Sequence, residues 1–383
     1  MKIIIAIDSF KDCLSSIEAA EAIASGIYDA APQAEVCSLP LADGGEGTVE
    51  AMIAAANGVL QTADVTGPLD EIVQASYGVM SDHTAVIEVS AACGLPLVPM
   101  PKRNPLHTTT YGVGEMIRHA VLQGCRQFII GLGGSATNDC GIGMLSALGW
   151  RFLDQEGRPV ANNGAALANI ASIDASGVME QLKDCHFRIA CDVDNPLYGH
   201  DGAAYIFAPQ KGADQATVEQ LDQGLRQFAE AANGFLGRDI ALMPGAGAAG
   251  GLGAAFVGFL GGELQSGIEL VLDRLNLAQH MAGASLVITG EGRLDGQTAR
   301  GKAPLGVAKL AAQQGIPVIA LAGSVQNTGS ELFSNGITAS FPIVSGPMTL
   351  EEAMKPERTR QHLRQTARQL MQLLQAASSD FRA

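Results

Sequence analysis

The sequence opens on a short run of apolar, largely β-branched residues that stops at an acid. Lys2–Ile7 is apolar after its first residue and ends at Asp8, which is typical of a strand buried in a parallel sheet. Ser15 and Glu18 then form a capping-box pattern, and the apolar stripe behind them predicts a helix. A second strand at Val36–Leu39 and a second helix repeat this order. The first sixty residues therefore predict the start of a doubly wound α/β sheet.

The alternation of strands and helices is interrupted in the middle of the chain and returns near its end. Three strand-like runs between residues 59 and 89 are separated by turn residues, which predicts an antiparallel meander. In the last hundred residues strands again alternate with helices, one of which has proline near its start and glycine after its end. We therefore expect a two-domain α/β fold. A Rossmann-like parallel sheet domain is formed by both chain ends, 1–60 and 281–383, and a second, mixed α/β domain is inserted at 61–280.

Composition narrows the class of partner. The formal net charge of −15 repels phosphate backbones and anionic lipids, so we expect neither nucleic acid nor a membrane as partner. The seven cysteines are odd in number and contain no C-x-x-C pair, which predicts reduced thiols in a cytoplasmic protein. Residues 240–262 carry no charge and could span a bilayer by length. Their eight glycines and one proline predict instead a glycine-rich loop that leads into a buried helix.

Two phosphate-binding patterns nearly occur. Gly296–Ala303 fits G-x-x-x-x-G-K, but alanine stands where a P-loop needs Ser or Thr for magnesium. The preceding strand is also expected to end near Thr289, several residues before a P-loop would begin. Gly245–Gly250 fits G-x-G-x-x-G without a convincing strand before it. We therefore expect no P-loop and no dinucleotide site, and expect Lys302 or Arg300 to contact an anion near the start of the next helix.

Five loops combine glycines or small residues with acids at predicted strand ends, and they are the stronger functional signal. Ligands of open α/β sheets bind outside the carboxyl ends of the strands. Asp8 and Asp43 could each cap a helix, but five such loops in one chain are harder to explain as caps. The loops are residues 8–11, 43–47, 131–139, 192–195 and 290–296.

The residue types in these loops suit phosphoryl transfer. Glycines let backbone N–H groups approach phosphate oxygens, and Lys11, Arg293 and Lys302 can neutralise charge. Carboxylates could hold Mg²⁺, directly or through water, or take the proton from an attacking hydroxyl. The histidines form no triad or metal spacing, and Ser135 does not sit in a G-x-S-x-G elbow.

Taken in order, these loops resemble the motifs of the bacterial glycerate kinase family of the first type. The resemblance covers essentially the whole chain, and it implies ATP-dependent phosphorylation of D-glycerate with Mg²⁺. The expected acceptor is the 2-hydroxyl, so the expected product is 2-phosphoglycerate. The resemblance also implies a two-domain protein whose active site lies between the domains. The segments that carry it are IAIDSFKDCLSS (5–16), LPLADGGEGT (39–48), GLGGSATNDCGIG (131–143), CDVDNPL (191–197), PGAGAAGGLGAAF (244–256) and TGEGRLDGQTARGKAP (289–304).

The resemblance leaves the role of each side chain open, so we assign roles from side-chain chemistry. The expected general base is Asp192 or Asp194, with Asp8 as the next candidate and Lys11 beside it in the catalytic set. The expected substrate-binding residues are Ser9, Asp43, Arg293 and Asp295. The expected nucleotide-binding residues are Gly133, Gly134, Ser135, Asn138 and Lys302, and the expected metal ligand is Glu291.

Three other functions stay open at this point. The same chemistry could phosphorylate the 3-hydroxyl of glycerate. A hydroxy-acid dehydrogenase would bind NAD(P) through Gly245–Gly250, although no such pattern follows the first strand. A sugar-acid sensor would bind ligand without turnover. The sequence also leaves open whether the chain forms a homo-oligomer.

Overall fold

The computed structural model describes residues 1–45, 47–56, 58–296, 298, 302–326 and 331–380. The chain divides into two compact units, which are described separately. Unit 1 contains Met1–Asp43, Glu50–Ala56 and Ile268–Ala383, and unit 2 contains Gly44–Val49 and Asn57–Gly267. The fold class expected from the sequence is confirmed, because both chain ends build one parallel sheet and the middle builds a mixed one. The domain boundaries at 60/61 and 280/281 stay a prediction.

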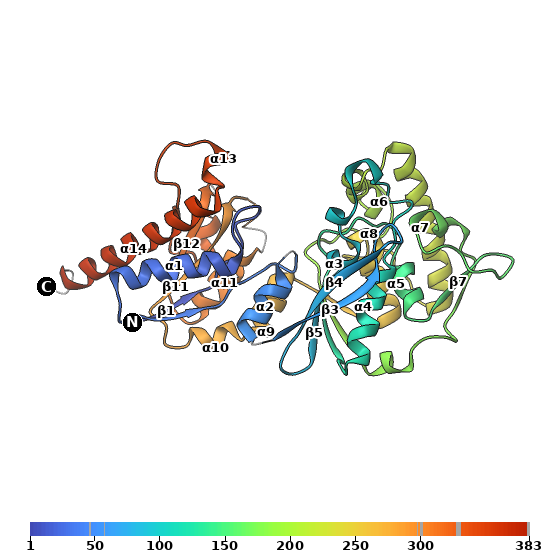
Figure 1. Cartoon of the computed structure of the whole chain (residues 1–383), viewed down its shortest axis with the longest axis horizontal. Coiled ribbons are helices and arrows are strands. Elements are labelled where there is room, and N and C mark those ends of the chain that lie inside the picture. Colours follow the sequence, from blue (N-terminus) through green and yellow to red (C-terminus); the bar gives the residue numbers. More distant parts are fainter. Residues whose placement is uncertain (46, 57, 297, 299–301, 327–330, 381–383) are drawn as a thin grey trace. The chain divides into compact units, whose positions relative to one another are not determined.

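Unit 1 is built on a five-stranded sheet in which every neighbouring pair is parallel (Figure 1). The order β13-β12-β11-β1-β2 puts the first strand of the chain in contact with a strand from its last hundred residues. The strands are β1 (Lys2–Ile5), β2 (Glu35–Ser38), β11 (Leu286–Leu294), β12 (Val318–Val325) and β13 (Ala339–Pro342).

Apolar side chains on both faces of this sheet are buried. Ile3 and Ile5 of β1 belong to a core cluster with Leu363 of α14, and Ile4, which faces the opposite way, is equally buried. Strands of a parallel sheet that is covered on both faces have continuous apolar sequences, and this pattern allowed the first strand to be predicted. The helices that lie wholly or mostly in unit 1 are α1 (Ser16–Ala30), α2 (Thr48–Ala56), α9 (Gly267–Arg274), α10 (Leu277–Met281), α11 (Ala303–Gln313), α12 (Glu331–Ser334), α13 (Leu350–Ala353) and α14 (Pro356–Asp380).

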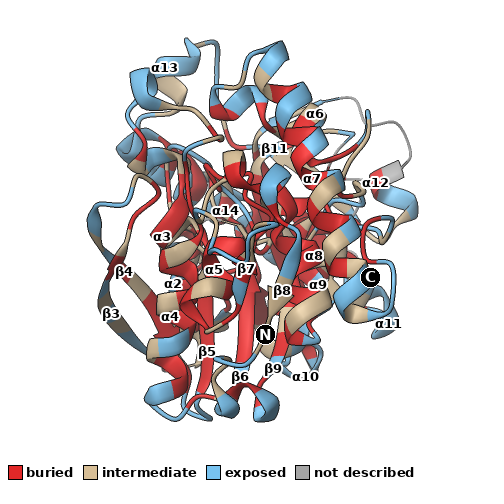
Figure 2. Cartoon of the chain, turned by 90° about the vertical axis from the view of Figure 1, so that its right-hand side faces the viewer, coloured by how far each residue is buried: buried red, intermediate tan, exposed pale blue. Residues whose placement is uncertain are grey.

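Unit 2 contains a six-stranded mixed sheet in the order β10-β9-β6-β5-β4-β3. The predicted meander is confirmed, since β3, β4 and β5 pair antiparallel, while β5, β6, β9 and β10 pair parallel. β5 and β6 are buried and the outer strand β3 is partly exposed (Figure 2). The strands are β3 (Val59–Thr66), β4 (Ile72–Val79), β5 (Thr84–Glu88), β6 (Gln127–Gly131), β9 (His186–Ala190) and β10 (Glu263–Gln265), with β7 (Arg151–Leu153) and β8 (Ser172–Asp174) as a separate pair.

The uncharged stretch near residue 250 is a buried helix preceded by a glycine-rich loop, as predicted. α8 (Ala248–Leu260) packs within the core of unit 2, and within the described residues no helix is both long and apolar enough to cross a membrane. The other α-helices are α3 (Ser90–Cys93), α4 (Tyr111–Leu122), α5 (Ile142–Ala147), α6 (Ala203–Phe207) and α7 (Gln215–Leu236). The 3₁₀ helices are η1 (Leu95–Leu97), η2 (Met100–Lys102), η3 (Gly164–Asn169), η4 (Glu180–Asp184) and η5 (Pro209–Lys211).

One strand is longer than the sequence predicted. β11 does not end near Thr289 but continues to Leu294, paired in parallel with β12. Gly290 permits this, because a Cβ there would lie 1.9 Å from the carbonyl oxygen of Leu321. The predicted strand end near Thr289, which placed the strand too far from Gly296 for a P-loop, is therefore wrong. Ala303, which lacks a hydroxyl for magnesium, still disfavours a P-loop.

Two helical glycines should respond oppositely to the same substitution. A Cβ on Gly26 of α1 would lie 2.1 Å from the carbonyl oxygen of Arg364 on α14, whereas one on Gly234 of α7 would meet nothing within 4 Å. We expect Gly26→Ala to lower stability by ~1–3 kcal/mol through overpacking. Gly234→Ala should raise it by up to ~1 kcal/mol through helix propensity. Calorimetric melting of both variants tests this, and a higher midpoint for Gly26→Ala would contradict the α1–α14 packing.

Candidate active site

The carboxyl ends of adjacent parallel strands bring acids together in unit 1. The backbone N–H of Asp8, just after β1, donates to the carbonyl of Gly290 in β11 at 3.0 Å. On the other side, the N–H of Leu41, two residues before Asp43, donates to the carbonyl of Ile7 at 2.9 Å. Asp8 therefore lies between Asp43 and Glu291, and the charges of both act on it.

Asp8 is a buried carboxyl with a strongly perturbed pKa. It is 5% exposed, and burial, followed by the charge of Asp43, raises its pKa to about 7. The N–H of Ser9, which donates to Oδ1 at 2.6 Å, and the charge of Lys11 oppose this rise. A carboxyl with a pKa near 7 can take up or release a proton at neutral pH, as a general base requires.

Glu291 is held by a hydroxyl that the sequence analysis missed. Thr298 is fully buried; its Oγ1 donates to Glu291 Oε1 at 2.5 Å and accepts from the N–H of Asp295 at 3.1 Å. Lys302 Nζ lies 3.7 Å from Glu291 Oε2. Burial raises the pKa of Glu291, and Thr298 and Lys302 work against that rise. The position of Thr298 three residues after Asp295 was the only feature of the sequence that could have indicated this contact. A single threonine forms no recognisable motif, so the contact was not predicted.

The remaining predicted residues of unit 1 lie on the same strand ends. Arg293 Nε lies 3.4 Å from Asp295 Oδ2, so these two form an ion pair. A Cβ on Gly292 would lie 3.7 Å from the backbone nitrogen of Lys11, which places β11 beside the loop that carries Ser9 and Lys11. Arg300, expected to contact an anion, lies outside the described residues.

The donor set of unit 1 fits Mg²⁺ in part. Across the described ranges, no three His, Cys, Asp or Glu side chains are grouped so that they alone could hold a metal. Mg²⁺, however, keeps several waters and is usually bound by one or two carboxylates together with substrate phosphates. Glu291 and Asp43, whose charges act on each other, are hard oxygen donors of that kind.

In unit 2 the predicted nucleotide-binding residues lie on the loop that follows β6. Gly133 and Gly134 are exposed and Ser135 and Asn138 are buried. Both atoms of the Asn138 amide lack a hydrogen-bond partner within the described structure. A buried amide without partners is costly and marks a place where a ligand or water completes the bonding.

Asp139 anchors this loop rather than facing a ligand. Its Oδ2 accepts from the N–H and the hydroxyl of Thr110 at 2.9 and 2.8 Å, and its Oδ1 accepts from the N–H of Gly141 at 3.1 Å. Burial raises the pKa of Asp139, and these hydrogen bonds oppose the rise. The acid in the predicted loop thus fixes the backbone that carries Ser135 and Asn138.

Lys211 is a second residue that the sequence analysis missed. It ends η5 and is 3% exposed. Its Nζ donates to Ser135 Oγ at 2.9 Å and to the carbonyl of Thr137 at 2.7 Å. No local motif surrounds Lys211, and its partners are more than seventy residues away in sequence, so only the tertiary structure reveals the contact.

The aspartates of the fourth predicted loop, residues 192–195, are exposed. Asp192 Oδ1 accepts from the N–H of Gly267, the first residue of α9, at 2.9 Å, and Asp194 is also exposed. Asp192 therefore has a structural contact at the start of a helix. A role for either residue as the base stays a prediction.

In the G-x-G-x-x-G pattern, the protein's own backbone occupies the space beside Gly247 and Gly250. A Cβ on Gly247 would lie 2.3 Å from the carbonyl oxygen of Pro196, and one on Gly250 would lie 2.1 Å from that of Thr137. These glycines therefore allow close packing of backbone against backbone. The packing gives the pattern a structural reason that needs no dinucleotide.

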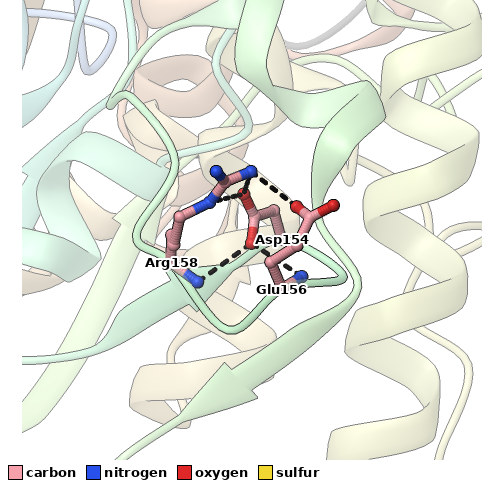
Figure 3. Close-up of polar contacts among 3 residues, drawn as sticks. All are labelled: Asp154, Glu156 and Arg158. Atoms are coloured by element: carbon pink, nitrogen blue, oxygen red, sulfur yellow. Dashed lines mark hydrogen bonds and ion pairs between the residues drawn. The ribbon is translucent and has the colours of Figure 1, made fainter.

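The structure also contains a hollow that includes no predicted site residue. It has a volume of about 760 Å³ and lies beside the β7–β8 pair. Its charged lining is internally paired: Arg158 donates to Asp154 at 3.0 Å and to Glu156 at 2.6 Å (Figure 3). With its charges already satisfied, this hollow offers less to an anionic substrate than the two loop clusters.

Comparison with known proteins agrees with the resemblance seen in the sequence. The model of the "Glycerate kinase family" matches residues 3–375. A protein of Escherichia coli K12 named glycerate 2-kinase is 50% identical over 93% of both chains. A Bacillus subtilis 168 protein named glycerate kinase is 48% identical over 100% of both chains. The crystal structure of a Salmonella typhimurium LT2 protein assigned as glycerate kinase 2 superposes with a TM-score of 0.90, at 47% identity over 99% of each chain.

The raised pKa of Asp8 predicts a pH-dependent cost to stability. Because the folded-state pKa of about 7 exceeds the ordinary 3.8, the folded state binds more protons between these values, and stability falls as pH rises through them. Asp8→Asn keeps the acceptor for Ser9 but removes the charge. We expect it to melt higher than the parent above pH 7 and nearly equally at pH 4.

Melting curves across that pH range measure this difference. Asp29→Asn is the control for which we expect the opposite change in melting temperature. Arg364 lowers the pKa of Asp29, so removal of the Asp29 charge should slightly destabilise the protein at neutral pH. Parallel curves for the parent and Asp8→Asn would show that Asp8 has no raised pKa.

Proposed function

The chain belongs to the glycerate kinase family, and we propose that it transfers the γ-phosphoryl group of ATP, with Mg²⁺, to the 2-hydroxyl of D-glycerate. The product would be 2-phosphoglycerate. The choice of hydroxyl is supported by the similarity to the relative named glycerate 2-kinase. The observation that carries the mechanism is the buried carboxyl of Asp8, with its pKa of about 7, between Asp43 and Glu291.

Asp8 would act as the general base. The attacking hydroxyl gives its proton to the Asp8 carboxylate as its oxygen forms the new bond to the γ-phosphorus, and the bond from that phosphorus to the β–γ bridging oxygen breaks to release ADP. We favour Asp8 over Asp192 and Asp194 because burial has matched its pKa to neutral pH. The other two are exposed, and Asp192 already accepts a backbone N–H.

The other residues of unit 1 would position and neutralise the reacting groups. Ser9 and Lys11 lie on the loop with Asp8, and Arg293 and Asp295 follow on β11. We assign these residues, together with Asp43, to glycerate and the transferring phosphoryl group. Glu291 and Asp43 would hold Mg²⁺, which when bound neutralises charge on the phosphate oxygens.

In unit 2, the loop after β6 would bind the nucleotide. Gly133 and Gly134 leave the backbone open to phosphate oxygens, and Ser135 and Asn138 supply a hydroxyl and an unpartnered amide. We assign Lys302 to the phosphates as well, since it lies at the N-cap of α11.

The seven cysteines form no disulfide bonds in the structure, which supports our proposal that the protein is cytoplasmic.

The alternatives are ordered by what the structure offers them. Phosphorylation of the 3-hydroxyl needs the same residues and differs only in the pose of the substrate, so it is the second candidate. A dehydrogenase loses its main support because Gly247 and Gly250 face protein backbone. A sensor would bind glycerate or ATP without forming ADP.

The reaction product distinguishes these functions. We expect the purified protein with ATP, Mg²⁺ and D-glycerate to form ADP, and enolase added alone to convert the product to phosphoenolpyruvate. Ultraviolet absorbance of phosphoenolpyruvate measures this directly. A signal that requires a phosphoglycerate mutase would assign the 3-hydroxyl, and absence of ADP with either glycerate isomer would exclude the kinase.

The identity of the base can be tested by matched amide substitutions. We expect Asp8→Asn to lower kcat by ~10²-fold or more, because no proton acceptor of suitable pKa remains. Asp194→Asn should retain kcat within a few fold. Asp192→Asn should also retain kcat within a few fold, and circular dichroism checks that this variant is folded. Near-normal turnover by Asp8→Asn, with a large loss in Asp192→Asn or Asp194→Asn, would move the base to that aspartate.

A further inference from the structure

Lys211 is a buried cation whose hydrogen-bond acceptors are both neutral. Its ammonium donates to the Ser135 hydroxyl and to the Thr137 carbonyl, and among the described residues these are its acceptors. No carboxylate of those residues lies within ion-pair distance of it. Burial of a charge without a paired counter-charge is costly, so such a group is retained where an anion completes the site.

The titratable groups that face Lys211 are the Cys93 thiol and the Asp139 carboxylate. Asp139 acts on it only through space, because its oxygens are occupied by Thr110 and Gly141. Burial outweighs both neighbours and lowers the pKa of Lys211 to about 8. At neutral pH the ammonium is therefore charged and incompletely compensated.

The bond from Lys211 also fixes the polarity of Ser135. An ammonium can only donate, so Ser135 Oγ accepts from it, and the serine's own hydrogen is left for another acceptor. The backbone N–H groups of Gly133, Gly134 and Ser135 have no acceptor among the described residues. Gly134 has a left-handed φ of 74°, and successive N–H groups around such a residue form a concavity that binds anions.

We propose that Lys211 is the positioning residue of an oxyanion site on the loop after β6. In this site the N–H groups of Gly133, Gly134 and Ser135 and the Ser135 hydroxyl donate to one oxyanion. Lys211 orients the hydroxyl and stabilises the bound charge from the core side. The oxyanion is a phosphate of the nucleotide or the carboxylate of the acid substrate. This inference deepens the proposed function and rests on it for the identity of the two substrates.

Replacement of Lys211 by a neutral side chain of similar length tests the site. We expect Lys211→Met to raise one Michaelis constant, for ATP or for D-glycerate, by ~10-fold or more, because a charge-assisted interaction is lost. Ser135→Ala, which removes only the buried hydroxyl, should raise the same constant by a smaller factor. A rise for ATP identifies the phosphate, and a rise for glycerate identifies the carboxylate. A fall in kcat or melting temperature with both constants unchanged would show a purely structural role.

The pH profile separates positioning from folding. The parent loses the Lys211 charge as pH rises through about 8, so its kcat/KM for the affected substrate should fall above that pH. The gap between parent and Lys211→Met should therefore narrow at pH 9. A gap that stays constant with pH would overturn the proposal. Lys183→Met is the matched control, since its side chain is 78% exposed on the same unit, and it should change neither constant.

Direct binding keeps this test distinct from the proposed function. Calorimetric titration of the parent with inorganic phosphate and with ATP needs no turnover. If the parent forms no ADP yet binds phosphate, and Lys211→Met binds it ~10-fold more weakly and Ser135→Ala more weakly by a smaller factor, the oxyanion site stands and the kinase proposal fails. If the parent forms ADP and the variants bind and turn over both substrates like the parent, the oxyanion site fails alone.

Discussion

The parallel register of β1 between β2 and β11 is the constraint on which the site of unit 1 depends. Adjacent parallel strands end on the same edge, so the acids that follow β1 and β2 meet Glu291 of β11 without any loop having to reach across. Burial, and after it the repulsion from Asp43 and Glu291, raises the pKa of Asp8 to about 7. This arrangement is unfavourable for folding, and the apolar sheet face buried against α1 and α14 helps to offset it. Reactivity at the strand ends and packing behind them thus depend on the same register.

Among the 46 glycines, those of α8 and those of the loop after β6 serve two different needs. Gly250 lets the backbone of α8 approach the loop after β6, where a side chain would collide with Thr137. Gly133 and Gly134 instead are exposed residues of that loop, and their N–H groups have no acceptor among the described residues. The first kind shapes the loop, and we propose that the second opens it to a ligand. A glycine-rich pattern in a sequence therefore does not by itself identify a phosphate site, because tight internal packing produces the same composition.

The sequence predicted what depends on local patterns and missed what depends on tertiary contact. The strand at the N-terminus, the capping box of Ser15 and Glu18, and the antiparallel meander all follow from periodicity and turn chemistry. The end of β11 was misplaced because Gly290 and Gly292 are typical of a loop, whereas here pairing with β12 extends the strand. Lys211 could not be found, since its contact with Ser135 joins residues 76 apart. The predicted roles of individual acids remain proposals for the same reason: burial, which decides them, is not local.

The acidity of the chain makes the placement of its few effective cations decisive. In unit 1, Lys302 lies beside Glu291 and Arg293 beside Asp295, so these cations first offset the protein's own carboxylates. Lys211 has no such partner within ion-pair distance in the described chain, and its charge is available to a bound oxyanion. The proposed base needs Asp8 ionised, above a pKa of about 7, while the proposed oxyanion site needs Lys211 protonated, below a pKa of about 8. If both act in one reaction, turnover is confined to a narrow interval near neutral pH, with burial setting each of its limits.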